Sequence, residues 1–297
     1  METVLITGAT GFLGAKVTAL FLAEGCRAVV LVRRNSAGER LKPFANHPRL
    51  VKIFLGEDDL KECFFKYKIS AIIHTATCYG RNDEPWHEIA GVNLLLPLQL
   101  LLAGEQAGVQ CFINADTFFN DKMSFASHEH FYVKTKKDFL AIVRDAAPQI
   151  KIKFFNLRIE QMYGPGDSAK KFIPAIIKEL LSNAKNIELT NGDQKRDFIF
   201  VDDVARAFVQ VFKSYPVLEN YQEFGIGHGR SVSIKEAVAY LKGITKSGSA
   251  LAFGRLNYRG NEIMDSRADL SANEKINWRA VINWRDGLQK TVDFFSA

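Results

Sequence analysis

The chain has 297 residues, of which 47% are hydrophobic and 24% charged, an ordinary composition for a globular protein with a large core. The net charge is +6, but the basic residues are spread without an arginine- or lysine-rich block, so we expect no nucleic-acid surface. An apolar strand starts within three residues of Met1, and the most apolar run, 94–102, is too short to span a bilayer. We therefore expect no signal peptide and no contact with a membrane. The four cysteines share no CxxC spacing, which predicts a reduced, cytoplasmic protein without disulfides or a metal site.

The first motif is a glycine-rich turn between a strand and a helix. An apolar run at 3–7 leads into three glycines at spacings of three, and 15–23 has the pattern of a helix. Glycine permits a tight turn, and the free N–H groups at a helix start favour a pyrophosphate, so the turn predicts a dinucleotide site. The cofactor-binding residues expected here are Gly8, Thr10, Gly11, Phe12, Leu13 and Gly14.

The second expected strand, 27–32, ends at Arg33, Arg34 and Asn35. An acidic residue at this place accepts hydrogen bonds from the ribose 2′-hydroxyl of NAD, whereas a guanidinium pairs with a 2′-phosphate. Because this chain has two arginines and no acid here, the sequence predicts that these three residues bind NADP(H). The alternative is two solvated arginines on a surface loop.

Further strands alternate with helices, the longest of which is expected at 89–106; these strands are 51–55, 71–74, 110–115 and 152–157. The alternation predicts an α/β fold, a doubly wound parallel Rossmann sheet. Ligands of such sheets bind beyond the carboxyl ends of the strands, which places Thr75, Ala76 and Thr77 beside the cofactor. Asn93 on the long helix is expected to face the same strand ends and to bind the cofactor. His74, at the end of its strand, is interpreted as a buried structural histidine.

Tyr132 and Lys136 stand one helical turn apart on a helix expected at 132–144. A tyrosine, with a pKa of about 10, is a useful general acid only when that pKa is lowered, and a nearby ammonium group lowers it. The lysine can also hold the nicotinamide ribose. A Tyr-x-x-x-Lys spacing is common by chance, but this one follows the fifth strand of a nucleotide-binding sheet. We therefore expect both residues to be catalytic and to contact the cofactor.

Beyond Arg158 the pattern becomes more turn-rich, which predicts a smaller second domain. The elements expected there are an amphipathic helix at 172–181, strands at 187–190 and 224–226, and helices at 233–242 and 286–295. Asp202 and Asp203 are expected to cap a helix.

Together these motifs resemble the extended short-chain dehydrogenase/reductase family, the NAD-dependent epimerases, dehydratases and reductases that act on nucleotide sugars. The resemblance is carried by TGATGFLG at 7–14, IIHTA at 72–76, Asn93, the Tyr132/Lys136 pair, YGPGD at 163–167, FIP at 172–174, RDFIFVDDV at 196–204 and IGHG at 226–229. It implies an NAD(P)-binding Rossmann domain with a smaller C-terminal domain that holds a nucleoside diphosphate sugar. On this basis we expect 1–158 with 197–225 to form the cofactor domain, and 159–196 with 226–297 to form the substrate domain.

A narrower resemblance is to the CDP-abequose and CDP-paratose synthases, which make 3,6-dideoxyhexoses for bacterial O-antigens. It is carried by CYGRNDEP at 78–85, FIN with a following threonine at 112–117, and NEIM at 261–264. The family's catalytic serine or threonine position holds Ala115 here, and we expect Thr117, on the same side of an extended segment, to take its role. The related dehydratases carry a glutamate at the position of Thr117, beside an aspartate that matches Asp116. The absence of this second carboxylate counts against a dehydratase.

The resemblance also implies which residues hold the substrate: Tyr79, Arg81, Gln161, Lys171, Arg196, Arg259 and Glu262. Arg196 and Arg259 match positions that bind the diphosphate, and Lys171 is a third candidate cation. Gln161 replaces the family's usual asparagine, and Glu262 is expected to accept a hydrogen bond from a nucleotide hydroxyl. For each of these residues a solvated surface side chain is the alternative, above all for Lys171.

The function expected from these residues is NADPH-dependent reduction of the C4 keto group of a nucleoside diphosphate sugar, a 4-keto-6-deoxy or 3,6-dideoxy hexose, with CDP as the expected nucleotide. Tyr132 would protonate the forming alkoxide, Thr117 would bind the carbonyl, and Lys136 would tune Tyr132. A C4 epimerase with tightly held NAD is a second possibility, which Arg33 and Arg34 disfavour. A non-catalytic NADP-binding regulatory protein is a third. The helices at 89–106 and 132–144 resemble the dimer interface of the family, and we expect a homodimer.

Overall fold

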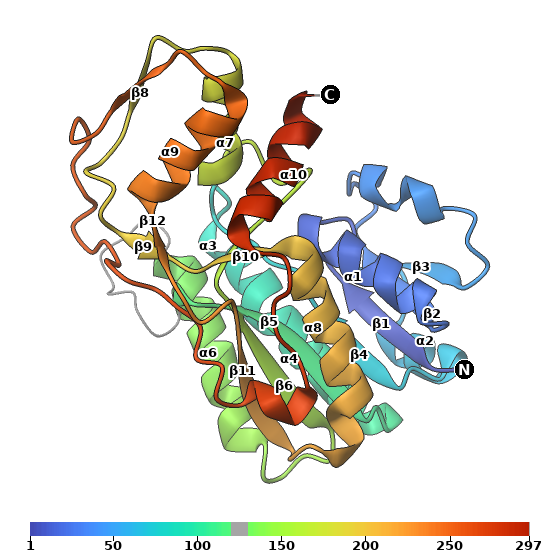
Figure 1. Ribbon diagram of the computed structural model, residues 1–297. Helices are drawn as coiled ribbons and strands as arrows, with labels where there is room; N and C mark the ends of the chain where they lie inside the picture. The colour runs from blue at the N-terminus through green and yellow to red at the C-terminus, as the bar shows by residue number, and fades with distance from the viewer. Residues whose placement is uncertain (120–129, 297) are drawn as a thin grey trace.

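The computed structural model describes residues 1–119 and 130–296. Its centre is a parallel seven-stranded sheet in the order β11-β6-β5-β4-β1-β2-β3 (Figure 1). The strands are β1 (Thr3–Thr7), β2 (Arg27–Val32), β3 (Leu50–Phe54), β4 (Ala71–His74), β5 (Cys111–Thr117), β6 (Lys153–Ile159) and β11 (Tyr221–Ile226). The strand order reverses between β1 and β4, where doubly wound sheets bind their ligands. The predicted Rossmann fold is confirmed.

Helices cover both faces of the sheet, which is why its strands are apolar almost throughout. On one face lie α1 (Phe12–Ala23) and α8 (Val201–Ser214). On the other lie α2 (Leu60–Tyr67), α4 (Leu96–Ala107) and α6 (His130–Ala146). Short helical segments are η1 (Glu39–Phe44), α3 (Trp86–Ala90), the π-helical turn η2 (Gly91–Leu95), η3 (Tyr215–Val217) and η4 (Asn273–Ile276).

A smaller region at the end of the sheet has its own hydrophobic core. Its helices are α7 (Phe172–Leu181), α9 (Ile234–Thr245) and α10 (Trp284–Ser296). Its strand pairs are β7 (Gln161–Tyr163) with β10 (Phe198–Phe200), β8 (Asn186–Glu188) with β13 (Ala250–Ala252), and β9 (Lys195–Arg196) with β12 (Val232–Ser233). Phe198 and Phe200 pack in this core, whereas Ile276 and Trp278 pack against the large sheet. The domain boundaries given above remain a prediction.

Two local expectations differ from the structure. Strand β5 continues through Asp116 and Thr117, which pair with β6, instead of ending at Ala115. The prediction that Asp202 and Asp203 cap a helix is wrong, because Phe200 is the N-cap and both carboxylates lie in the first turn of α8. There Asp203 accepts hydrogen bonds from the backbone N–H groups of residues 281 and 282, at 3.0 and 2.9 Å.

The apolar helix is longer than expected. It runs from Trp86 to Ala107, and by length and hydropathy alone it could cross a membrane. Leu100 is fully buried against the sheet, but 53% of Leu95 and 61% of Leu102 are exposed. The helix therefore packs one side on the sheet and presents further leucines on its outer side.

Candidate functional site

The glycine-rich turn between β1 and α1 has the shape of a phosphate cradle. Gly8 has a φ of +68°, and the Gly11 N–H donates to the Gly8 oxygen at 2.8 Å. A Cβ at Gly14 would lie 2.1 Å from that oxygen, and a Cβ at Gly8 would lie 2.6 Å from the Ala76 nitrogen. The first turn of α1, which the structure describes completely, has no side-chain cap and no acidic residue. Its N–H groups and positive dipole end therefore suit a dinucleotide pyrophosphate.

The end of β4 is fastened to the end of β1 by side chains. Thr75 donates from its hydroxyl to the Thr7 oxygen at 2.7 Å, and the Ala76 N–H donates to the Thr7 hydroxyl at 3.2 Å. Next to them, Nδ1 of the buried His74 lies 2.9 Å from the same hydroxyl. Burial, assisted by the charge of Lys136, lowers the pKa of His74 to about 3. His74 is the neutral structural residue that the sequence predicted.

Asn93 lies in the π-helical turn and is 2% exposed. Its amide bonds both backbone groups of Cys78, accepting from the N–H at 2.9 Å and donating to the oxygen at 2.8 Å. The amide also lies 3.3 Å from the Thr135 hydroxyl on α6. Since its polar groups are engaged within the protein, Asn93 holds the loop after β4 against α6; its contact with a cofactor remains a prediction.

Lys136 and Tyr132 lie close together on α6, as their spacing predicted, and Lys136 reaches the end of β5. The Lys136 ammonium donates to the Ala115 oxygen at 2.7 Å and lies 6.0 Å from the centre of the Tyr132 ring. Both residues are 5% exposed. Burial lowers the pKa of Lys136, and the nearby Asp116 carboxylate opposes this change.

The loop after β4 adds a stack of side chains to this pair. The ring of Tyr79 lies 4.9 Å from the ring of Tyr132, and the Arg81 guanidinium lies 4.7 Å from the Tyr79 ring. The structure thus brings two predicted substrate residues next to the predicted proton donor.

Thr117 ends β5 with its hydroxyl 3.3 Å from the Phe119 N–H. Alternation along the strand puts Thr117 and Ala115 on one face and Asp116 on the other. The Asp116 carboxylate accepts from the Asn156 amide at 2.9 Å, within a polar row across β5, β6 and β11. Sequence reasoning missed Asn156 and Glu223, whose amide and carboxylate are 3.2 Å apart. The signal for Asn156 was a polar residue between Phe155 and Leu157 of an expected strand, whereas Glu223 lies just before the expected strand at 224–226 and gave no such signal.

No acidic residue follows β2 in the sequence, but the fold brings an acidic residue from the segment after β3, Glu57, to the tip of β2. Arg34 donates to both carboxylate oxygens of Glu57, with 2.6 Å from Nε, and its guanidinium lies 4.9 Å from the Phe54 ring. The hydrogen bonds from Arg34 hold the pKa of Glu57 below its usual range. Arg33 and Asn35 are exposed beside this pair. The loop arginines are thus not equivalent.

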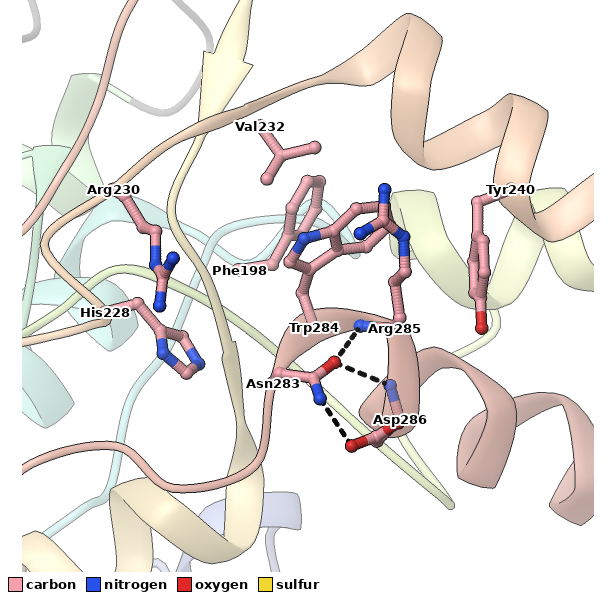
Figure 2. Close-up of a pocket in the computed structure, with 9 residues that line it drawn as sticks. All are labelled: Phe198, His228, Arg230, Val232, Tyr240, Asn283, Trp284, Arg285 and Asp286. Atoms are coloured by element: carbon pink, nitrogen blue, oxygen red, sulfur yellow. Dashed lines mark hydrogen bonds between the residues drawn. The ribbon is translucent and has the colours of Figure 1, made fainter.

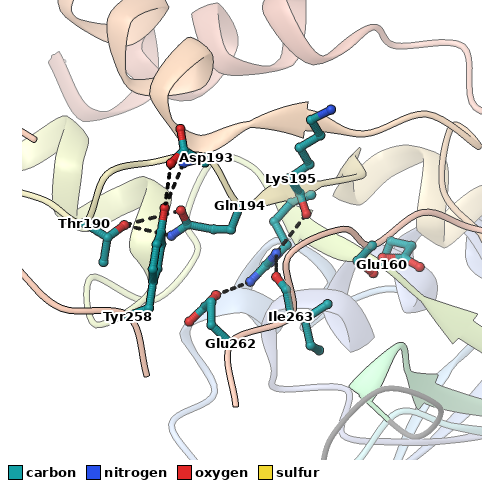
Figure 3. A network of polar contacts seen from close by, with 10 residues as sticks. Glu160, Thr190, Asp193, Gln194, Lys195, Tyr258, Glu262 and Ile263 are labelled. Carbon is teal, nitrogen blue, oxygen red and sulfur yellow. Dashed lines mark hydrogen bonds and ion pairs between the residues drawn. The ribbon is translucent and has the colours of Figure 1, made fainter. Parts of the chain in front are cut away.

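The predicted substrate residues Arg196 and Glu262 bind each other. Arg196 donates to the Glu262 carboxylate and to the backbone oxygens of Lys195 and Ile263 (Figure 3). Its side chain is 11% exposed, and burial lowers its pKa while Glu262 opposes this change. Arg259 is exposed nearby in sequence, on the segment that leads to Glu262. A diphosphate would therefore have to compete with Glu262 for Arg196.

Lys171 is not a solvated surface charge. Its ammonium pairs with the Asp167 carboxylate at 3.0 Å and lies 5.4 Å from the ring of Phe12 in the glycine-rich turn. Burial raises the pKa of Asp167, and Lys171 opposes this change. Gln161 is half-buried on β7, where its N–H donates to the Asp197 oxygen at 3.1 Å. Lys171 thus lies where the two regions of the protein meet.

Comparison with known proteins identifies the family. Residues 4–227 match the NAD dependent epimerase/dehydratase family. The chain belongs to this family. The family resemblance predicted from the sequence motifs is confirmed, and with it an enzyme family that uses nicotinamide cofactors.

Similar proteins within the family act on different sugar nucleotides. The chain is 32% identical to a CDP-abequose synthase of Salmonella typhimurium over 97% of both proteins. It is 25% identical to a UDP-glucuronate 4-epimerase of Thermodesulfobacterium geofontis, over 98% of this chain and 95% of the relative. Its fold is similar to that of MoeE5 in complex with UDP-glucuronic acid and NAD, with a TM-score of 0.81, 25% identity and 99% of both chains covered.

A separate cavity of about 370 Å³ opens at the start of α10 (Figure 2). It is lined by Phe198, His228, Arg230, Val232, Tyr240, Asn283, Trp284, Arg285 and Asp286, none of which the family motifs assign to a ligand. Arg285 pairs with Glu236 at 3.0 Å and stacks on Trp284, and Asn283 caps α10. The polar groups of this cavity are thus largely engaged with neighbouring residues.

Proposed function

We propose that this family member is an NADPH-dependent 4-ketoreductase of a nucleoside diphosphate sugar, with a CDP-linked 4-keto-3,6-dideoxyhexose as the expected substrate. The observation that carries the proposal is the buried Tyr132/Lys136 pair at the end of a strand that finishes with Thr117. Thr117 replaces the carboxylate that dehydration requires. The similarity to CDP-abequose synthase along 97% of the chain supports the CDP-sugar class.

When bound, NADPH would supply the hydride for C4 of the sugar. Tyr132 donates its phenolic proton to the C4 oxygen, and the Thr117 hydroxyl donates a hydrogen bond to the same oxygen. The Lys136 ammonium, oriented by the Ala115 oxygen, stabilises the phenolate that remains. Asn93 keeps the loop that carries Tyr79 against α6.

The substrate's diphosphate is assigned to Arg196, Arg259 and Lys171, and its sugar to the side of Tyr79 and Arg81. Binding requires Arg196 to exchange its pairing with Glu262 for phosphate oxygens. Glu262 is then free to accept a hydrogen bond from a nucleotide hydroxyl.

The test is to mix the purified protein with NADPH and a CDP-4-keto-3,6-dideoxyhexose, follow the loss of NADPH absorbance and identify the product by NMR. Stoichiometric NADPH oxidation with a new C4 hydroxyl is expected. The corresponding UDP- and dTDP-sugars, offered in parallel, define the nucleotide. No oxidation with any of the three would contradict the reductase assignment.

A C4 epimerase with retained NAD is the second candidate, and the Arg34–Glu57 pair favours it, since this pair reduces the positive charge available to a 2′-phosphate. Chromatography of the nucleotides released by denaturing the purified protein separates the candidates. Stoichiometric NAD, together with epimerisation of a 4-hydroxy sugar nucleotide without net cofactor consumption, would support the epimerase.

We further propose a cytoplasmic homodimer formed through the outer sides of η2, α4 and α6, where Leu95, Leu102 and Ile142 are exposed. Light scattering is expected to give twice the chain mass at micromolar concentration. The double variant Leu95→Glu/Leu102→Glu should give the single mass, whereas a monomeric parent protein would refute the proposal.

A further inference from the structure

Two arginines follow the tip of β2, and a third, Arg40, lies on η1 in the same β2–β3 connection. The Glu57 carboxylate binds Arg34 along one edge of the guanidinium, through Nε and Nη2, so part of its charge is compensated before any ligand arrives. A phosphate at Arg34 would have to compete with this carboxylate or lie beside it. Arg34 is therefore a poor anion ligand in spite of its position in the sequence.

Arg40 is held in a different way. Its guanidinium donates to the Thr10 oxygen at 3.4 Å and to the Gly166 oxygen at 2.9 Å. Both acceptors are neutral, and within residues 1–119 and 130–296 no carboxylate forms an ion pair with Arg40. The buried Asp167 is close enough for Arg40 to favour its charged form and so to lower its pKa, but that carboxylate is already paired with Lys171. Two of its five N–H donors are used, which leaves three for a ligand. Arg40 therefore keeps both its charge and the capacity to donate hydrogen bonds.

The position of Arg40 matches the expected path of the cofactor. The pyrophosphate of a dinucleotide lies at the start of α1, and the adenosine ribose lies between the glycine-rich turn and the tip of β2. Arg40 contacts the turn at Thr10 and comes from the chain that follows β2. The Arg40 guanidinium thus lies beside the glycine-rich turn, on the side where η1 packs.

We propose that Arg40, together with Arg33, forms the cationic site for the 2′-phosphate of the cofactor, and that Glu57 withdraws Arg34 from this role. The inference rests on the proposed use of NADPH and names the residues that would select it. It changes the sequence-based assignment, which relied on Arg33 and Arg34.

The test is a titration of the cofactor-free protein with NADPH, NADH, 2′,5′-ADP and ADP, read by calorimetry or tryptophan fluorescence, so that no substrate is needed. Arg40→Gln is expected to weaken NADPH and 2′,5′-ADP binding about tenfold and to leave NADH and ADP unchanged. Arg40→Lys should lose less, because it keeps the charge. Arg34→Gln should change all four affinities less than about twofold. Lys42→Gln is the matched control, since Lys42 lies on the same segment and pairs with Glu39 at 2.6 Å on the surface.

The outcomes separate the inference from the proposed function. Equal losses for NADH and NADPH in Arg40→Gln would place Arg40 on the shared pyrophosphate, and a tenfold loss in Arg34→Gln would restore the sequence assignment; both overturn the inference alone. A parent protein that binds NADH as tightly as NADPH would overturn the proposed cofactor choice, and this inference with it. Unchanged thermal unfolding of each variant shows that the affinities report on contacts.

Discussion

The glycine-rich turn and the surroundings of Arg196 are both expected to hold phosphates, yet they present their positive charge in opposite ways. At the turn, α1 starts without a side-chain cap, and Arg40 is held by neutral carbonyl oxygens. Around Arg196, the guanidinium is already paired with Glu262 and shielded from solvent. An anion can enter the first site directly, whereas in the second it must displace a carboxylate.

This difference has a consequence for specificity. Breaking a half-buried ion pair costs free energy that a ligand recovers only by replacing its contacts well. The turn should therefore accept dinucleotides readily, whereas the Arg196 region should reject anions that cannot also satisfy Glu262. A nucleoside diphosphate offers both phosphate oxygens and ribose hydroxyls.

The largest expected effect is on kcat, and ligand binding at the glycine-rich turn and around Arg196 should stay unchanged. Tyr132→Phe removes the proton donor and should lower kcat about a thousandfold, since a positioned general acid contributes about 10²–10⁴-fold. Thr117→Ala should cost about a hundredfold, the effect of losing one positioned hydrogen-bond donor. Single-turnover oxidation of NADPH with a 4-keto sugar nucleotide measures both. Near-parental rates in Tyr132→Phe with none in Thr117→Ala would reverse the two roles.

Gly14→Ala should weaken ligand binding at the glycine-rich turn and leave binding around Arg196 unchanged. The added Cβ would lie 2.1 Å from the Gly8 oxygen, so the turn must shift away from α1. An overpacking cost of about 1–3 kcal/mol predicts roughly a fivefold to 150-fold loss of NADPH affinity, with CDP affinity unchanged. Titrations with each ligand measure this. Gly243→Ala on α9 is the control, because no atom lies within 4 Å of its Cβ; a parallel fall in CDP affinity would show that the sites are not independent.

Glu262→Gln should make the Arg196 guanidinium more available to an anionic ligand. The amide no longer neutralises Arg196, so CDP should bind about threefold to tenfold more tightly while NADPH affinity stays the same. Calorimetry with CDP measures the change, and Glu236→Gln, which weakens a different surface pair with Arg285, is the control. The amide oxygen of the glutamine can still accept a hydrogen bond from a nucleotide hydroxyl, so a loss of CDP affinity would show that the charge of Glu262 aids nucleotide binding more than it hinders it.

The smallest expected effect is on the pH dependence of folding stability, and it concerns His74, which contacts Thr7 next to the glycine-rich turn. Because the pKa of His74 is about 3 in the folded protein and about 6.5 in the unfolded chain, the unfolded chain binds more protons between these values. The contribution of His74 to stability is therefore constant above about pH 6.5 and falls as the pH decreases below it. His74→Gln should flatten this part of the profile in denaturant unfolding measured from about pH 4.5 to 8. The exposed His87→Gln should retain the parental slope, and an unchanged slope in His74→Gln would contradict the prediction.

Much of the region around the candidate active site could be predicted, because short stretches of sequence specify its geometry. The run before Gly8, the glycine spacing, and the single turn between Tyr132 and Lys136 each specify geometry within a dozen residues. Strand ends were less certain: β5 extends to Thr117 because pairing with β6 continues past the apolar run. The role of Asp203 was missed because the N–H groups that donate to it belong to residues 281 and 282, on a segment that only the fold brings to α8.

The sequence by itself determined the Rossmann fold, the cofactor turn and the Tyr132/Lys136 pair, because strand periodicity, glycine geometry and helical spacing act over short distances along the chain. Only the tertiary structure decided which charges remain available to a ligand. Arg34 meets Glu57 across 23 residues, Arg196 meets Glu262 across 66, and Arg40 meets Gly166 across 126. Such pairings depend on which loops the parallel crossovers bring together, and a side chain's own sequence neighbourhood carries no record of them.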